Sequence, residues 1–217
     1  GAFEVHSRAG HYTCDLILDL GETPCLTTAL LAPGYLTTRS DAQSNAEAVS
    51  QLAELVGRFE KPQYFQLRTE ICAHGASELT GCTRCLDACP AEAIFSIGNT
   101  VEVNPHLCQG GGACATVCPT GAISYAYPAA GDTLDRVRRM LRAFSDAGGE
   151  QAILVLHTEA FNADSLTPDE LPLCVEELAS VGLELWLSAL AFGARQVLLV
   201  RDAGITDSVL QALQEQR

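Results

Sequence analysis

An internal repeat of cysteines constrains the fold of this chain more than any other feature. Seven of its ten cysteines lie between Cys72 and Cys118. A shift of 29 residues aligns Cys85 with Cys114 and Cys89 with Cys118. The same shift aligns three further pairs, namely Pro90 with Pro119, Ala93 with Ala122 and Ile94 with Ile123. The chain therefore contains two copies of one structural unit.

Each copy approximates the pattern C-x2-C-x2-C-x3-C-P. In proteins with this run, three thiolates hold one iron-sulfur cluster and the fourth binds the other cluster. Residues 72–119 therefore resemble the bacterial two-cluster ferredoxins. The first copy keeps its last three cysteines, but Leu79 stands at the leading position. We expect Cys72, which lies upstream, to fill this position through a longer loop.

The second copy departs from the pattern differently, because Gly111 stands where its second cysteine should be. The ferredoxin pattern exchanges the fourth ligands between the copies, which implies four thiolates for one cluster and three for the other. The expected ligands of the first cluster, a [4Fe-4S] cube, are Cys72, Cys82, Cys85 and Cys118. The expected ligands of the second cluster are Cys89, Cys108 and Cys114.

The missing thiolate leaves the type of the second cluster open. A cube that lacks one protein ligand either loses that iron and becomes [3Fe-4S], or keeps the iron with water, hydroxide or another side chain. The three-iron ferredoxins that this copy resembles also lack the second cysteine. We expect a [3Fe-4S] cluster or a [4Fe-4S] cluster with a labile iron. The alternative is an intact cube with His74 or His106 as the extra ligand.

Cysteine pairs of this spacing also occur in zinc sites and in disulfide-linked domains. A structural zinc site needs four N or S ligands, but it needs neither the Cys-Pro that closes both copies nor the Ala-Ile that follows each. Disulfides form in oxidising compartments, and the chain opens without the charged and apolar segments of a secretory signal. The pattern therefore favours iron-sulfur clusters in a cytoplasmic protein.

The net charge of the chain limits the classes of partner that it is expected to bind. The formal net charge is −14, with 13 basic and 27 acidic residues. Nucleic acids and anionic membranes bind basic patches, so neither is an expected partner. No apolar run reaches the length of a membrane span, and we expect no membrane insertion. An acidic surface suits docking to a basic face of a redox protein.

Hydrophobic periodicity predicts a short α/β pattern before the cysteines. Residues 11–20 and 25–32 are predicted to be extended, and a helix is predicted from Ser40-Asp41 to Gly57. Residues 64–68 are predicted to form a strand that leads into Cys72.

Within the cysteine region, the segments after each Cys-Pro, 91–98 and 120–127, are predicted to enter short strands. In the ferredoxin fold that the motif implies, these two strands pair with each other across a pseudo-twofold axis. Residues 101–105 supply another extended piece. So short a region buries little apolar area, so we expect cluster formation to drive its folding.

The last third of the chain predicts a β-α-β-α order after an initial helix. The helix covers 132–144, and it is followed by a buried strand at 152–158 and a long helix at 174–193 that begins at Cys174. A strand at 196–200 and a helix at 206–216 complete a small parallel sheet. No glycine-rich phosphate loop opens either helix of this β-α-β-α run. Residues 193–198 resemble, in their Gly-Ala-x-x-Val-Leu run, the delta-type electron-carrier subunits of hydrogenase and heterodisulfide reductase systems.

These patterns predict an α+β fold in which a ferredoxin-like two-cluster iron-sulfur module is combined with a small α/β domain. The expected segments are 1–70, 71–127 and 128–217. The first and last are either separate α/β segments or halves of one domain into which the module is inserted.

The cysteine motifs, taken with CDLILDLG at 14–21 and F-x-K-P at 59–62, resemble proteobacterial 4Fe-4S-binding proteins associated with formate dehydrogenase systems. This resemblance implies a non-catalytic electron carrier or oxidoreductase subunit that relays single electrons to a redox partner. The alternative is an iron-sulfur site whose open iron, beside Gly111, binds a ligand, senses or catalyses. The sequence leaves the choice between carrier and enzyme open.

Overall fold

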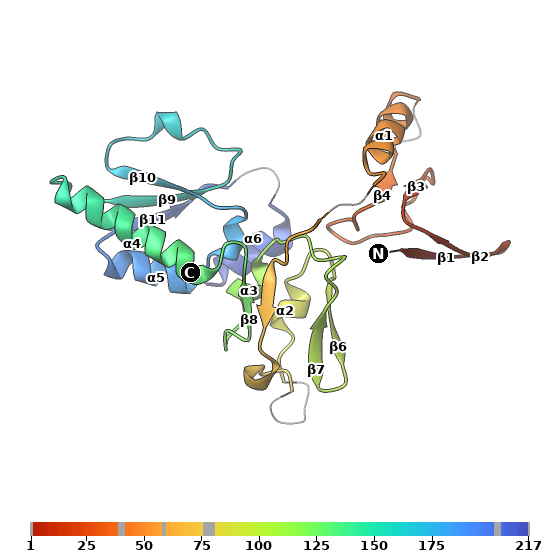
Figure 1. Ribbon diagram of the computed structural model, residues 1–217, viewed down its shortest axis with the longest axis horizontal. Coiled ribbons are helices and arrows are strands. Elements are labelled where there is room, and N and C mark those ends of the chain that lie inside the picture. The colour runs from red at the N-terminus through yellow and green to blue at the C-terminus, as the bar shows by residue number, and fades with distance from the viewer. Residues whose placement is uncertain (1, 39–41, 58–59, 76–80, 202–204, 217) are drawn as a thin grey trace. The chain divides into compact units, whose positions relative to one another are not determined.

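The computed structural model describes residues 2–38, 42–57, 60–75, 81–201 and 205–216. Its contacts divide the chain into two compact units, Gly1–Lys61 and Pro62–Arg217, which we describe one at a time (Figure 1). The predicted boundaries near residues 70 and 127 stay predictions. Over the described residues, every helix is too short or too polar to cross a membrane.

The first unit is built from two small strand pairs and one helix. Its elements are β1 (Phe3–Ser7) antiparallel to β2 (Gly10–Cys14), β3 (Ile17–Asp19) parallel to β4 (Tyr35–Thr37), and α1 (Ala42–Glu54). The Asp19 carboxylate accepts hydrogen bonds from the Tyr35 hydroxyl, from Cys25 N at 2.8 Å and from Gly21 N at 2.9 Å. These bonds, that from Tyr35 above all, hold the pKa of Asp19 well below its usual value.

The strand predictions for this unit were only partly right. The predicted strand at 11–20 is interrupted at Asp15 and Leu16, and residues 25–32 form no strand. The predicted helix is confirmed from Ala42 onward, whereas its start at Ser40-Asp41 lies outside the described residues. No strand pairs with Thr27, Thr28 or the turn residues around Pro24. The apolar residues of this segment therefore do not form a strand.

The second unit reproduces the internal repeat in three dimensions. The short helices α2 (Arg84–Asp87) and α3 (Ala113–Thr116) lie 29 residues apart. The strands β6 (Ile94–Ile97) and β8 (Ile123–Tyr125) begin at the same interval. The two copies therefore share one order, in which a cysteine-bearing helical turn is followed by Cys-Pro and a strand.

The pairing of these strands differs from the prediction. β8 pairs antiparallel with β5 (Phe65–Leu67), and β6 pairs antiparallel with β7 (Thr100–Val103). The prediction that the two repeat strands pair with each other was therefore wrong. The physical reason lies in the two-residue turn after β6, whose first residue, Gly98, has φ of 59°. Such a turn folds the chain straight back on itself, so β6 finds its partner locally.

The C-terminal part of the second unit is a three-stranded parallel sheet with helices. The strand order is β10-β9-β11, with β9 in the centre. The elements are α4 (Ala130–Asp146), β9 (Ile153–His157), β10 (Glu170–Cys174), α5 (Leu183–Ala191), β11 (Gln196–Leu199) and α6 (Asp207–Gln214), with short 3-10 turns at Thr69–Ile71 (η1), Ala163–Ser165 (η2) and Leu178–Ser180 (η3). α4 and α5 pack against each other beside the sheet (Figure 1).

The predicted long helix at 174–193 was wrong over its first half and right over its second. Cys174 ends the edge strand β10, and a helix forms only from Leu183 onward. Pro172 fits this edge strand, where a missing N–H need not break a ladder. Gly182 precedes α5, where an added Cβ would lie 3.0 Å from Thr116 Cγ2. Gly182 therefore allows the start of α5 to approach α3 closely.

One hydrophobic core joins the cysteine region to the parallel sheet. Ala88, Ala113 and Val117 come from the cysteine region and are buried in the same cluster as Val137 and Leu154. Thr116 Oγ1 adds a buried hydrogen bond of 2.5 Å to the carbonyl of Ala179. α2 and α3 are therefore held from outside the cysteine sets as well as from within.

Candidate iron-sulfur site

Four cysteines face one small pocket in the second unit. Cys72 follows η1, Cys82 and Cys85 flank the start of α2, and Cys118 follows α3. All four line the same pocket, together with apolar residues that include Val101. The structure therefore brings together the four thiols expected at the first cluster, including Cys72 from its longer loop.

The remaining three cysteines form a second set next to the first. Burial raises the pKa of Cys114 to about 12, and the charges of Cys89 and Cys108 add to the rise, followed by that of Cys85. Burial likewise raises the pKa of Cys85 to about 11, with contributions from Cys118, Cys72 and Cys82. Cys85 and Cys114 both pack against the apolar cluster of Ile94, Val101 and Ile123, which places the two sets side by side.

Apolar side chains surround both sets. Ile94, Val101 and Ile123 are buried between the strands of the two repeat copies, and five of the cysteines pack against them. Phe65 and Leu67 of β5 contact the same cluster. Such a shell limits the access of water and lowers the local dielectric, and both effects tune the potential of a metal centre.

Backbone N–H groups point at equivalent sulfurs in the two copies. Ala93 N donates to Cys89 Sγ at 3.4 Å. Burial raises the pKa of Cys118, but N–H groups led by that of Ile123, with Thr120 and Ala122, outweigh burial and lower its pKa overall. Because Ala93 and Ala122 are equivalent in the repeat, the turn after each Cys-Pro directs a backbone N–H group at the sulfur of the preceding cysteine.

His74 holds the loop that carries Cys72. Its side chain is only 1% exposed, and its Nδ1 donates to the carbonyl of Cys82 at 2.7 Å. Its Nε2 lies 2.7 Å from Ser96 Oγ on β6. Next to it, Gly75 lies so close to the hairpin that an added Cβ would be 1.7 Å from Asn99 O. His74 therefore borders the first set of thiols, with both ring nitrogens engaged.

We expect His74→Ala to lower the free energy of unfolding by about 2 to 4 kcal/mol, since it opens a cavity and removes two buried hydrogen bonds. Anaerobic urea unfolding of the iron-loaded protein measures the change. His11→Ala is the control, because His11 is exposed and lies outside the cysteine region, and exposed substitutions change stability by about 0.5 kcal/mol or less. Equal stability of the two variants would contradict a structural role for His74.

Gly111 lies in open space. An added Cβ there would meet nothing within 4 Å among the described residues. Its two neighbours are crowded, because a Cβ on Gly110 would lie 2.7 Å from the Tyr64 ring and one on Gly112 would lie 2.5 Å from Ser180 Cα. The position that lacks the expected cysteine is therefore the one place in this glycine run that accepts a side chain.

The thiols are grouped but separated. Over the described part of the chain, no three His, Cys, Asp or Glu side chains are arranged to hold a single metal ion. In a [4Fe-4S] cluster each thiolate binds a different iron, so the thiolates need not converge on one ion. The donor set, its apolar shell and its N–H groups fit such a cluster.

Comparison with known proteins agrees with this chemistry. Residues 101–124 match the 4Fe-4S binding domain. This domain includes three of the cysteines, Cys108, Cys114 and Cys118. The chain thus carries a ferredoxin-type iron-sulfur domain within a mixed helix and sheet structure, and the match supports a role in electron transfer.

Two known proteins share short stretches with the chain. Hydrogenase-4 component A of Escherichia coli (strain K12) is 48% identical over 40 residues, which cover 18% of this chain and 20% of that protein. A ferredoxin of Saccharopolyspora erythraea is 39% identical over 41 residues, which cover 19% of this chain and 39% of the ferredoxin. The chain thus spans less than two-fifths of either protein. No solved structure matches it significantly.

The roles of His74 and Tyr64 were not predicted from the sequence. His74 was expected to be a solvated or hydrogen-bonding residue rather than an extra ligand, but the sequence did not indicate that its hydrogen bonds join the Cys72 loop to β6. The glycine that follows His74 was the available signal, since glycine is used where a backbone segment approaches another group closely. Nothing in the sequence indicated that Tyr64 would pack on Gly110.

Proposed function

We propose that this protein relays single electrons between redox partners through two iron-sulfur clusters. The observation that carries the proposal is that four cysteines line one pocket, while Cys89 and Cys114 pack with three of those four against one apolar cluster. When bound, such clusters take up and release single electrons, and the protein sets their potential and access. The chain itself holds the thiolates close together, orients them and shields them from water.

The first set is proposed to bind a [4Fe-4S] cluster through four cysteines, Cys72, Cys82, Cys85 and Cys118. The pocket that these thiols line and the N–H groups directed at Cys118 support this assignment. His74 positions the loop with Cys72, which replaces the cysteine missing at Leu79.

The second set is proposed to bind a [3Fe-4S] cluster, or a [4Fe-4S] cluster with a labile iron, through Cys89, Cys108 and Cys114. Gly111 supports this choice, because the position of the fourth thiolate has no side chain and its surroundings are open. His74 borders the other set and is a poor candidate for the vacant ligand position.

The partner is proposed to be a redox protein in the cytoplasm, such as a subunit of a formate dehydrogenase-type complex. The likeness to hydrogenase-4 component A supports membership of a redox complex. The net charge of −14 supports docking to a basic face, which speeds encounter at low ionic strength.

A second function rests on the open space at Gly111. If the second cluster keeps a fourth iron there, that iron has room for a small molecule, and the site would act as a ligand-binding, sensing or catalytic centre. Added small ligands would then change the spectrum of the second cluster, whereas a pure electron carrier would show no such change.

Electron paramagnetic resonance (EPR), with iron and sulfide analysis, tests the proposal on protein purified without oxygen. We expect a narrow, nearly isotropic signal in the oxidised protein that disappears on reduction with dithionite, together with about seven iron atoms per chain. An oxidised sample without an EPR signal and with about eight iron atoms per chain would mean that the second cluster is a complete [4Fe-4S] cube. Iron-free protein that contains zinc under the same handling would overturn the electron-transfer proposal.

A further inference from the structure

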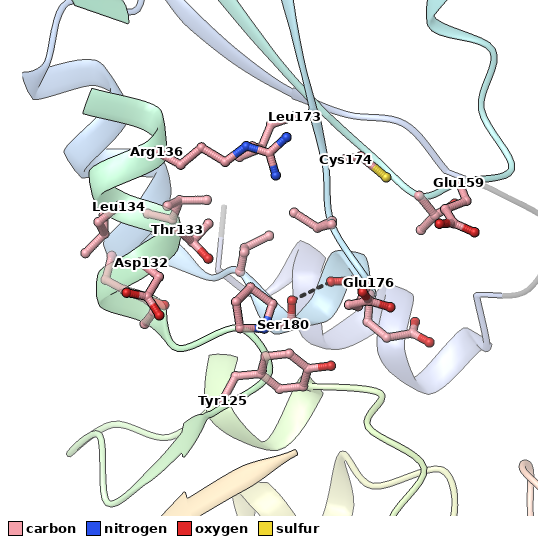
Figure 2. Close-up of a pocket in the computed structure, with 18 of the residues that line it drawn as sticks. Tyr125, Asp132, Thr133, Leu134, Arg136, Glu159, Leu173, Cys174, Glu176 and Ser180 are labelled. Carbon is pink, nitrogen blue, oxygen red and sulfur yellow. Dashed lines mark hydrogen bonds between the residues drawn. The ribbon is translucent and has the colours of Figure 1, made fainter. Parts of the chain in front are cut away.

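A cavity separate from the cysteine pocket lies at one edge of the parallel sheet. It has a volume of about 660 Å³ and borders the carboxyl ends of β9 and β10 at Thr158 and Cys174 (Figure 2). The N-terminal half of α4 forms the facing wall. Ligands of open parallel sheets bind at this edge, and cavities of this size hold small organic molecules.

Tyr125 at the floor of this cavity has a buried hydroxyl group without a partner. Tyr125 is 6% exposed, and its hydroxyl forms no hydrogen bond to any described residue. Figure 2 shows the ring beneath Ser180, with the hydroxyl directed toward the side where Glu176 lies. A buried hydroxyl is almost always hydrogen-bonded, so its unmet bond points to a molecule that enters the cavity.

The wall formed by α4 supplies positive charge. Figure 2 shows the Arg136 guanidinium pointing into the cavity, and Arg139 lines the same wall. Arg136 forms no ion pair with the residues that the structure describes, whereas Arg138 and Arg142 on the same helix pair with Asp135 and Asp146. Asp132 occupies the first turn of α4 and repels an anion there. A bound anion is therefore expected at Arg136, which lies one helical turn after Asp132 on α4.

The opposite wall supplies hydrogen-bond acceptors. Glu159 follows β9, and Glu176 and Glu177 follow β10. Burial raises the pKa of Tyr125, and the charges of Glu177 and Glu176 add to it, so its hydroxyl stays a donor. Carboxylates at the ends of parallel strands accept hydrogen bonds from vicinal hydroxyls of a sugar.

We propose that this cavity binds a nucleoside-type monophosphate, meaning a molecule with a planar ring, a polyol and one phosphate. The phosphate meets Arg136 and Arg139, and the polyol hydroxyls donate to Glu159 and Glu176. The ring packs against apolar residues of the lining, Val175 and Leu185 among them, and Tyr125 donates to a ring acceptor.

The charges of the cavity disfavour a ligand with several phosphates. Its lining contains five carboxylates, from Asp132, Glu159, Glu176, Glu177 and Glu184, against the two guanidiniums of Arg136 and Arg139. A diphosphate or triphosphate would meet more repulsion from these carboxylates than a monophosphate held at the arginine wall. This arrangement also needs no glycine-rich loop, because side chains rather than backbone N–H groups meet the phosphate.

The floor of the cavity leads toward the second set of cysteines. Tyr125 stacks on Tyr64 with ring centroids 6.4 Å apart, and Tyr64 lies against Gly110, between Cys108 and Cys114. Adenosine monophosphate (AMP) and flavin mononucleotide (FMN) share the proposed chemistry. Only FMN carries a redox-active ring, so the test must separate the two.

Anaerobic isothermal titration calorimetry of the full iron-loaded chain with AMP, FMN and inorganic phosphate tests the proposal. We expect one saturable site for AMP or FMN with Kd below about 1 mM. Arg136→Gln is expected to weaken binding at least tenfold. Arg142→Gln is the matched control, since Arg142 is exposed on the same helix and lies outside the cavity, so this variant should bind as the parent does.

Tyr125→Phe provides the second variant. It removes only a hydroxyl that no described residue bonds, so the ligand-free protein should unfold at an unchanged or higher temperature while AMP or FMN binds several-fold more weakly. Binding of FMN alone would identify a flavin site. Equal binding of AMP and FMN would identify a general nucleotide site.

Three results would overturn the proposal: absence of binding by both nucleotides, equal binding by inorganic phosphate, and unchanged affinity in Arg136→Gln. Iron and sulfide analysis of the same samples reports separately on the proposed electron-transfer site.

Discussion

Replacing Gly111 with cysteine is expected to abolish the narrow EPR signal of the oxidised protein and to raise its iron content from about seven to about eight atoms per chain. The substitution restores the missing member of the C-x2-C-x2-C-x3-C-P run in the second copy. The added Cβ meets no described atom within 4 Å, and Gly111, unlike both of its neighbours, does not have a positive φ. The new thiolate therefore costs little backbone strain.

Gly112→Cys is the matched control for this prediction. It adds the same thiol one residue away, but Gly112 has φ of 74° and its Cβ would lie 2.5 Å from Ser180 Cα. We expect this variant to lose stability without gaining an iron. Should Gly111→Cys keep both the oxidised signal and the iron content of the parent, the ligand set proposed for the second cluster would be wrong.

The repeat made the cysteine region the most predictable part of the chain. Residues 29 apart occupy equivalent helices and strands, because each copy must bring its thiols to a metal centre through the same local turn. The helix at 132–144 and the buried strand at 152–158 were likewise correctly predicted, as α4 and β9. Their strong 3.6-residue and continuous apolar patterns leave little choice of structure.

The errors arose where tertiary contacts decide between local alternatives. The sequence predicted no strand at β10, and its last residue, Cys174, was placed at the start of a helix. The apolar run from Leu173 to Val175 is too short to separate strand from helix by periodicity. Pairing with β9 settles its structure. In the same way β6 paired with its own hairpin partner rather than with β8, which the repeat alone could not reveal.

The cavity beside β9 and β10 could not be predicted from the sequence. Its floor and walls come from Tyr125, the first turns of α4, and the segments after two strands. These pieces are distant in the chain and carry no motif, and one of the strands was itself unrecognised. An unpartnered hydroxyl such as that of Tyr125 becomes visible only when its neighbours are placed.

Removing iron is expected to unfold the cysteine region while the parallel sheet stays folded. Amide hydrogen exchange should accelerate about 100-fold or more in β5, β6, β7 and β8, equivalent to about 2.7 kcal/mol. The apolar core of these strands has only three buried residues, Ile94, Val101 and Ile123, and five of its nine partly buried neighbours are cysteines. Metal binding supplies folding free energy in such small sites.

The sheet serves as the internal control in the same experiment. Leu154, Leu156 and Leu173 are at most 1% exposed and belong to a core that does not depend on the thiols. Amides of β9 and α4 should therefore exchange within about threefold of their rates in the iron-loaded protein. α2 and α3 are expected to lie between these limits, because Ala88 and Ala113 are anchored in the core of the sheet. Native-like protection at Ile94 and Ile123 without iron would show that the apolar contacts suffice, and cluster binding would then add function to a fold that exists without it.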